Sequence, residues 1–329
     1  MLPVIFHIRV GGLDLPVYGY GLMLVVAFLA ASRWAKSLAG RLGLDGEAFV
    51  NAGLLALISG IVGARLSHVL ENLPEFLRPD RSLWQNLRSM ADISSGGLTY
   101  YGGFLLATPV LLWYGRRKRL PLRRSMDIVA PCLMLALGLG RIGCFLNGCC
   151  YGHICHLPWA VRFPYHSNAY VDQVDAGLIS PPDELIARRL PDGRVVLHPP
   201  DAARKDAHLK AVMRSQRALP VHPTQLYTTL YAVLLALLLY AYLTYMPAPG
   251  RVFALMLVLE GTARYVMELL RVEPAVAGPF SLSMLIGLGM VIAGTAMWTL
   301  CGRMQPAEPG GSPAQRPGSP RAAARTSQK

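Results

Sequence analysis

The sequence has 329 residues, of which 53% are hydrophobic and only 16% are charged, and its mean hydropathy is +0.37. Soluble domains carry roughly 25% charged residues, so this composition excludes an ordinary soluble protein and favours a polytopic membrane protein. The formal net charge of +13 does not require a nucleic-acid partner, because membrane proteins use Lys and Arg to set their orientation and to attract anionic lipid headgroups.

Seven apolar stretches predict seven transmembrane helices in an all-α fold. Several of them exceed the roughly 18 apolar residues that suggest a bilayer span. The predicted spans are residues 18–35, 48–70, 97–115, 126–146, 223–245, 251–271 and 280–301. The N-terminal stretch lacks a basic region followed by a compact apolar core, so we expect no cleavable signal peptide.

The spans divide the chain into a membrane domain and two polar segments. We expect residues 1–302 to form the membrane domain. Within it, the polar segment 147–222 is long enough to form a small outward-facing head domain. Residues 303–329 are rich in Pro, Gly, Ala and Ser, so we expect them to form a disordered, basic tail in the cytoplasm.

The distribution of basic residues predicts the orientation in the membrane. A dense basic cluster follows the third span, and the positive-inside rule assigns such a short loop to the cytoplasm. Strict alternation of the spans then puts the N-terminus and the head outside and the C-terminal tail inside. The head is too long to obey the rule, so its arginines do not contradict this orientation. The cluster consists of Arg116, Arg117, Lys118, Arg119, Arg123 and Arg124.

Ionisable side chains within three spans need a reason, because each costs roughly 2.5–3.5 kcal/mol on insertion scales. They could neutralise one another in a stripe that holds helices together, or they could bind an anion. Arg65, Arg141 and Arg264 outnumber what the glutamates of the sixth span can neutralise, and this surplus favours a phospholipid phosphate. The residues concerned are Arg65 and His68 in the second span, Arg141 ending the fourth, and Glu260, Arg264, Glu268 and Arg271 in the sixth.

Small and aromatic residues near the predicted outer ends allow two interpretations. Gly102 and Gly103 enter the third span, where glycine permits close approach of another helix or of a ligand. Helix packing is at least as good an explanation as a ligand. Tyr20 stands beside glycines at the start of the first span, where it could belong to an interfacial aromatic belt or line a pocket.

Four cysteines follow the fourth span closely: Cys144, Cys149, Cys150 and Cys155, with two histidines interleaved. A disulfide is favoured, because the segment is predicted to face an oxidising compartment. Packed free thiols and a zinc site remain alternatives. The run lacks the paired Cys-x2-Cys spacing that makes a zinc assignment strong, so we predict no metal and no cofactor.

Four motifs together resemble the prolipoprotein diacylglyceryl transferase family over roughly residues 14–302. "GRIGCFLNGCCYG" at 140–152 is similar to the family signature Gly-Arg-x-Gly-Asn-Phe-x-Asn-Gly-Glu-x-x-Gly. "HPTQLY" at 222–227 and "EGTARYVMELLR" at 260–271 resemble the motifs of the fifth and penultimate helices. "YGLM" at 20–23 fits the motif of the first span.

The resemblance implies an enzyme of the bacterial inner membrane. Members of the family transfer diacylglyceryl from phosphatidylglycerol to the lipobox cysteine thiol of a preprolipoprotein, forming a thioether and releasing glycerol phosphate. It implies phosphatidylglycerol, lipobox signal peptides and membrane lipids as partners, and no nucleic acid.

The resemblance also implies roles for individual residues. Arg141 and Arg264 would bind the phosphate, Glu268 would orient Arg264, Tyr20 would line the lipid site, and Gly152 would shape the signature loop. Tyr101 stands at the position of the family's catalytic histidine. His68 is not implied by the resemblance; it joins the expected catalytic group as a candidate for the missing base, because it lies one turn from Arg65. The other expected substrate-binding residues are Arg65, Gly102, Gly103, Cys144, Asn147, Cys149, His222, Gln225 and Glu260.

The chain departs from the family pattern at four positions. Tyr101 stands where the family commonly has His, and Glu260 where it often has Tyr; Cys144 and Cys149 replace the Asn and Glu of the signature. Tyrosine, with a pKa near 10, is a poor base unless arginines depress that value. His68 could replace the missing base or could be a structural, helix-capping histidine. A thiol near two arginines could also need little help, because cations lower its pKa.

These departures leave two alternative functions open. A non-catalytic homologue that binds lipid or peptide would keep Arg141 and Arg264 but would not catalyse transfer. A transferase with a different acceptor or headgroup would keep them as well.

Overall fold

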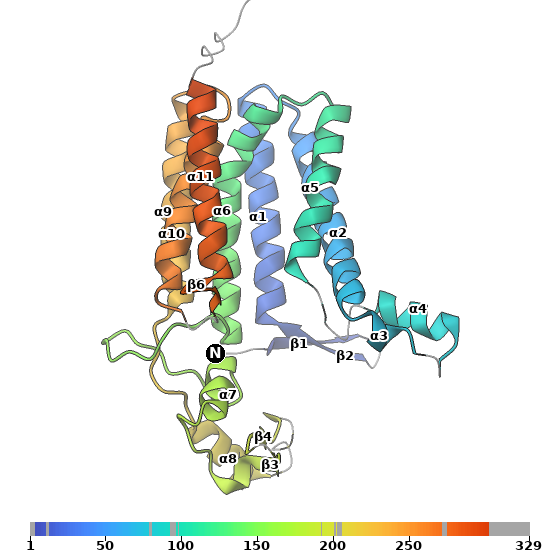
Figure 1. The fold of residues 1–329 in the computed structure, drawn as a ribbon, viewed down its shortest axis with the longest axis vertical. Coiled ribbons are helices and arrows are strands. Elements are labelled where there is room, and N and C mark those ends of the chain that lie inside the picture. The colour runs from blue at the N-terminus through green and yellow to red at the C-terminus, as the bar shows by residue number, and fades with distance from the viewer. Residues whose placement is uncertain are drawn as a thin grey trace, which may run out of the picture.

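The computed structural model describes residues 4–302 except 11–12, 79–80, 93–96, 98, 192, 201, 203–205 and 272–274. The predicted tail, 303–329, therefore lies outside the described residues. The described part contains seven helices of 18 or more residues, drawn upright and side by side in Figure 1. They are α1 (Gly19–Arg41), α2 (Gly46–Glu71), α5 (Tyr100–Arg117), α6 (Leu122–Asn147), α9 (Thr224–Thr244), α10 (Arg251–Glu268) and α11 (Leu282–Gly302). Each overlaps one predicted span.

Five of these helices are long and apolar enough to cross a membrane: α1, α2, α6, α9 and α11. Large apolar side chains on them, such as Leu29, Ile58, Leu230 and Ile292, are exposed, as a lipid-facing surface requires. The chain is therefore a multi-pass membrane protein. The other two predicted spans are the 18-residue helices α5 and α10, and α10 carries four charged residues within its length.

An apolar core closes one end of the bundle. It combines the C-terminal ends of α1 and α9 with the N-terminal ends of α2, α6 and α10, through residues such as Leu38, Ile128, Leu239 and Val252. Asp127 of α6 is buried beside this core, where its carboxylate accepts hydrogen bonds from the first backbone N–H groups of α10. This contact satisfies free donors of that helix and fixes its start against α6.

Helix α2 forms a separate close pair with α5. A Cβ atom added to Gly102 would lie 2.4 Å from the carbonyl oxygen of Gly63, and one added to Gly103 would lie 2.8 Å from that of Gly60. The two backbones touch at these glycines, and α1 lies between this pair and α6 in Figure 1. The helix-packing interpretation of Gly102 and Gly103 therefore accounts for both residues.

The chain is mainly helical, as expected for an all-α membrane protein, and its connecting segments contain a little β-structure. Three antiparallel hairpins lie in the described residues: β1 (Val4–Val10) with β2 (Leu13–Tyr18), β3 (Ile186–Arg189) with β4 (Val195–Leu197), and β5 (Ala275–Ala277) with β6 (Phe280–Ser281). The hydropathy patterns of whole spans could not reveal such short strands, because two to seven residues carry little periodicity.

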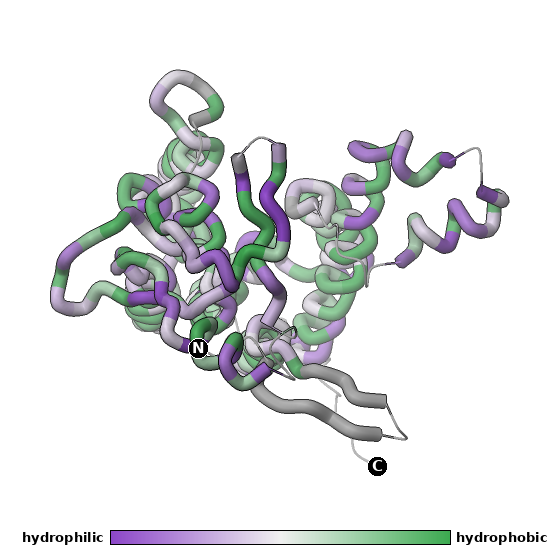
Figure 2. The backbone as a smooth tube through the Cα atoms, turned by 90° about the horizontal axis from the view of Figure 1, so that it is seen from below, coloured by the Kyte–Doolittle hydropathy of each residue, from purple (hydrophilic) through white to green (hydrophobic). Residues whose placement is uncertain are grey.

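Short helices and a second apolar core complete the polar end of the molecule. The helices are α3 (Leu73–Phe76), α4 (Leu83–Ala91), α7 (Asn168–Asp175) and α8 (Ala207–Ser215), with a 3-10 turn at Asp183–Leu185. The segment after α6 has its own core around Phe163, Tyr170 and Val221, each with no exposed surface. Figure 2, which views this end, shows hydrophilic stretches in the short helices and connections.

Candidate functional site

The candidate site lies at the end of the bundle opposite the apolar core, around Arg141 on α6. The first turn of α1 packs on α6 here because residue 143 is glycine: a Cβ atom would lie 3.2 Å from a ring carbon of Tyr20. Tyr20, Tyr231 of α9 and Glu260 of α10 all lie within electrostatic range of the Arg141 guanidinium. Four helices therefore contribute to one polar group.

Helix α10 supplies an ion pair that faces this group. Arg264 Nη2 lies 3.6 Å from Glu260 Oε1, and the Tyr231 hydroxyl donates to the same oxygen over 3.5 Å. Glu260 is only 2% exposed. Among the described residues, neither Glu260 Oε2 nor Arg264 Nε has a hydrogen-bond partner, although both atoms are buried. Such unmet polar atoms are rare in folded proteins, and they leave capacity for a polar ligand.

The contacts of Glu268 correct one expected role. Its carboxylate lies 3.6 Å from Arg271 Nη1 and accepts a 2.6 Å hydrogen bond from the Ser281 hydroxyl. Arg264 pairs instead with Glu260, one turn earlier, because helical side chains lean toward the N-terminus of their helix. Glu268 thus joins the end of α10 to the start of α11 rather than orienting Arg264.

Positive charge is in excess at the site. Arg141, Arg264 and Arg271 are accompanied by two buried carboxylates, those of Glu260 and Glu268. This agrees with the predicted surplus of arginine, although the third arginine of the group is Arg271 and not the predicted Arg65. A cluster of guanidinium groups with one net positive charge suits a phosphate group.

The signature loop is held in place by the "HPTQLY" motif. Gly148 ends α6 with a φ of 74°, a conformation that glycine adopts without strain. Beyond it, the carbonyl groups of Cys149 and Cys150 accept 2.7 Å hydrogen bonds from the side chains of Gln225 and Thr224. Both donors are buried, so the loop has a fixed shape. Gln225 therefore acts on the loop backbone.

Gly152 lies where three segments converge. Its N–H donates to the His222 carbonyl over 3.0 Å, and it forms an isolated bridge with Arg271. A Cβ atom there would lie 2.5 Å from the Leu270 carbonyl oxygen, so only glycine fits. This contact is consistent with the loop-shaping role expected for Gly152.

Two further motif residues lie around this junction. His222 Nδ1 lies 3.3 Å from the Tyr227 hydroxyl, which also accepts a 2.7 Å hydrogen bond from Trp159 Nε1. Asn147 is the last residue of α6 and is exposed. His222 thus belongs to a network that positions the loop.

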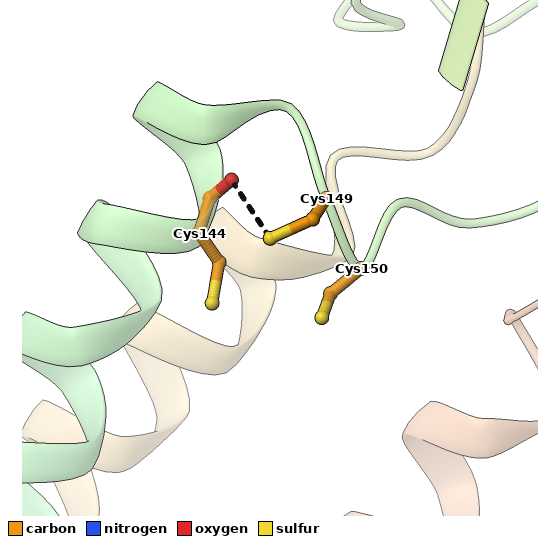
Figure 3. A group of neighbouring side chains, drawn as sticks. All are labelled: Cys144, Cys149 and Cys150. Carbon is orange, nitrogen blue, oxygen red and sulfur yellow. Dashed lines mark hydrogen bonds between the residues drawn. The ribbon is translucent and has the colours of Figure 1, made fainter. Parts of the chain in front are cut away.

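The cysteines are free thiols rather than the disulfide that the sequence favoured. The sulfur atoms of Cys144, Cys149 and Cys150 lie within 4.8 Å of one another. Figure 3 shows Cys144 on the last turns of α6 and the other two on the loop that follows, with the Cys149 thiol 3.7 Å from the Cys144 carbonyl oxygen. Hydrogen bonds with the two neighbouring thiols and the charges of Arg141 and Arg271 lower the pKa of Cys150.

Arg65 is engaged in structural contacts on α2. Its guanidinium donates to the carbonyl oxygens of Met90 (2.8 Å), Ser89 (2.8 Å) and Gly97 (3.0 Å), and it lies over the Phe76 ring. Arg65 is 6% exposed. These hydrogen bonds tie the end of α4 and the entry to α5 onto α2.

His68 and Tyr101 also belong to the α2–α5 pair. His68 Nδ1 lies 3.3 Å from the amide nitrogen of Asn72, and its ring packs edge-on against Phe76. Tyr101 is 46% exposed at the start of α5. Of the expected catalytic residues, these two therefore come from α2 and α5, whereas Arg141 comes from α6 and Arg264 and Glu268 from α10.

Sequence reasoning did not select Tyr231, Cys150 or Arg271 as site residues. Tyr231 stands one turn beyond Tyr227 in a long apolar helix, where nothing in the pattern distinguishes it from a packing residue. The sequence identified Arg271 only as one of the charged residues of the sixth span. Its backbone bridge to Gly152 places it next to the signature loop. For Cys150, its place next to Cys149 was the available signal.

Comparison with known proteins decides the family. The model of the prolipoprotein diacylglyceryl transferase family matches residues 3–300. This chain belongs to the prolipoprotein diacylglyceryl transferase family. The match includes the signature loop, "HPTQLY" and the charged end of α10, so the resemblance drawn from four motifs is confirmed.

Family members from distant bacteria are similar to this chain. Proteins named phosphatidylglycerol–prolipoprotein diacylglyceryl transferase are 27% identical over 301 residues in Clostridium tetani (91% of this chain, 98% of the relative) and 30% identical over 306 residues in Photorhabdus laumondii (90% of each). A third, from Rhodopirellula baltica, is 37% identical over 163 residues, 49% of this chain. The aligned part is only 32% of that relative.

Proposed function

We propose that the protein transfers the diacylglyceryl group of phosphatidylglycerol to the lipobox cysteine of preprolipoproteins. The observation that carries this proposal is the polar group around Arg141, in which Arg264 and Glu260 retain buried atoms without a partner among the described residues. The relatives named for this reaction match over most of their length. The partners would be phosphatidylglycerol and signal peptides with a lipobox.

The arginines would act on the phosphate of the lipid. In the transfer, the acceptor sulfur attacks the glyceryl carbon, a C–S bond forms, and the C–O bond to phosphate breaks. The electron pair leaves with glycerol phosphate, and the thiol proton passes to solvent. Arg141 and Arg264 would donate to the phosphate oxygens as negative charge increases on them, which stabilises the transition state more than the bound lipid.

The topology proposed for this reaction has seven spans in the bacterial inner membrane, with the N-terminus outside and the C-terminus in the cytoplasm. Helices α5 and α10 stand upright beside the five apolar ones in Figure 1, which supports counting them as spans. The basic cluster after α5 lies at the end opposite Arg141. The site would then open toward the outer leaflet, and segment 147–222 would form an outward head.

A transfer assay with an arginine variant tests the proposed function. Purified protein is incubated with phosphatidylglycerol and a synthetic lipobox peptide, and the mass of the peptide is measured. We expect a diacylglyceryl increment on the peptide cysteine. For Arg141→Ala we expect the transfer rate to fall by at least about a hundredfold, because one donor to a developing oxyanion contributes about 10²–10³ in kcat.

Arg124→Ala is the matched control, because Arg124 lies on the same helix at the opposite end and donates to the Pro247 carbonyl over 3.2 Å. It should keep most of the activity. An unchanged rate in Arg141→Ala would refute the assignment of the phosphate site. Lipid binding without any increment would instead favour the non-catalytic homologue, which the replacement of the family's His by Tyr101 and of its Asn by Cys144 supports.

A further inference from the structure

The three clustered thiols form a group that the proposed transfer does not yet use. The sulfur atoms of Cys144, Cys149 and Cys150 lie within 4.8 Å of one another (Figure 3). In a tetrahedral zinc site with Zn–S bonds of about 2.3 Å, sulfur atoms lie roughly 3.8 Å apart. The thiols therefore need to approach by only about 1 Å, which rotation of their side chains can supply.

The backbone that carries the thiols is already fixed. Cys150 has a φ of 60°, which is uncommon for a residue with a side chain. Buried Gln225 and Thr224 hold the carbonyl groups on either side of this bend, as described above. A strained backbone held by buried hydrogen bonds is typical of functional sites.

The charges around the cluster suit a metal bound by thiolates. Three thiolates and one Zn²⁺ carry a net charge of −1. The Arg141 and Arg271 guanidinium groups both lie within electrostatic range of the Cys150 sulfur. Positive charge next to the cluster compensates an anionic centre, and thiolate ligands select soft or borderline ions such as zinc.

We propose that Cys144, Cys149 and Cys150 bind a zinc ion whose fourth position accepts the incoming substrate thiol. This inference rests on the proposed function. Zinc sites with three protein ligands keep an open position for a reactant, and a thiol coordinated to zinc loses its proton. The family's histidine is replaced here by Tyr101, and a metal-activated thiolate would not need that base.

The reaction then balances without a further reagent. The lipobox thiol binds the metal and releases its proton to water. The bound thiolate attacks the glyceryl carbon while Arg141, beside Cys150, binds the phosphate that leaves with the C–O electron pair. The product thioether is a weaker, neutral ligand, so it dissociates and frees the metal for another thiol.

Metal binding is tested without reference to activity. Purified, reduced protein is loaded with Zn²⁺ or Co²⁺ in detergent, excess metal is removed, and bound metal is measured by mass spectrometry and by the cobalt–thiolate absorption band. We expect one metal per chain. Cys144→Ser and Cys150→Ser should each weaken binding about tenfold or more, whereas Cys155→Ser should not, because Cys155 is buried outside the cluster.

Addition of the substrate separates the metal hypothesis from the proposed function. A lipobox peptide with cysteine should change the cobalt spectrum, and the same peptide with serine should not. The zinc site is overturned if the protein binds no more metal than the Cys144→Ser variant. It is also overturned if a Cys144–Cys149 or Cys144–Cys150 disulfide persists in mild reductant. Full transfer by chelator-treated protein overturns it too, while the transferase assignment stands. Metal and peptide binding without transfer in the loaded protein would leave the site intact and refute the transferase.

Discussion

At the scale of single residues, the site depends on how four helices direct their polar side chains. Arg141 comes from α6 and Arg264 from α10, and both lie within electrostatic range of the Tyr231 hydroxyl of α9. The sequence predicted both arginines, because a charge within an apolar span is costly and needs a reason. It did not predict that Glu260, rather than Glu268, would be the partner of Arg264.

Replacement of Glu260 tests this pairing. Glu260→Gln keeps the shape of the side chain but removes the charge that orients Arg264, and we expect the transfer rate to fall by roughly tenfold to a hundredfold, the equivalent of one charge-assisted hydrogen bond. Steady-state kinetics with the peptide assay would measure the loss. Unaltered kcat and KM in Glu260→Gln would show that Arg264 does not depend on this carboxylate.

The thiol of Cys150 provides a pH-dependent prediction. A lowered pKa means that its thiolate, the form that reacts with iodoacetamide, persists below the range of an ordinary thiol, whose pKa is about 8.5. Alkylation of metal-free protein, followed by peptide mass spectrometry, should therefore reach half its maximal rate at a lower pH than alkylation of a free cysteine peptide. Arg141→Ala should move this midpoint upward; a profile equal to that of the peptide would contradict the lowered pKa.

At the scale of elements, glycine decides which helices pair closely. The contacts of Gly63 with Gly102 bring α2 and α5 together at backbone distance. The sequence shows glycines at the entry to this span, but it left open whether they allow the close approach of a ligand or of another helix. The answer depends on which helix lies opposite, and a single sequence does not carry that information.

Adding one methyl group tests this interface. Gly102→Ala places a carbon 2.2 Å from Ser67 Cβ, so we expect overpacking to destabilise the protein by about 1–3 kcal/mol and to lower its melting temperature in detergent. Gly40→Ala in α1 is the matched control, because nothing lies within 4 Å of the added carbon. If both variants had the same melting temperature as the parent protein, the close α2–α5 contact would be refuted.

At the scale of the whole molecule, the fold separates an apolar end from a polar end. The core around Ile128 and Leu239 closes one end, and the polar group around Arg141 lies at the other. The second apolar core, in the segment that follows α6, lies on the same polar side of the molecule.

Protease accessibility tests the orientation of the molecule. In right-side-out spheroplasts, a protease site inserted at the exposed turn of Gly193 should be cleaved, and a site attached after Lys329 should be protected. Immunoblotting of the fragments would measure both. Cleavage at the C-terminus but not at Gly193 would reverse the proposed topology.

The sequence by itself determined the helices, their apolar faces and the family, because these follow from local composition and from motifs that are contiguous in the chain. It also identified Arg141 and Arg264 as costly charges within apolar spans. Only the tertiary structure decided that Arg65 binds backbone carbonyls, that His68 contacts Asn72 and Phe76, and that three free thiols cluster beside Arg141. These outcomes depend on distances between residues that are far apart in the chain, and such distances arise only when the helices pack.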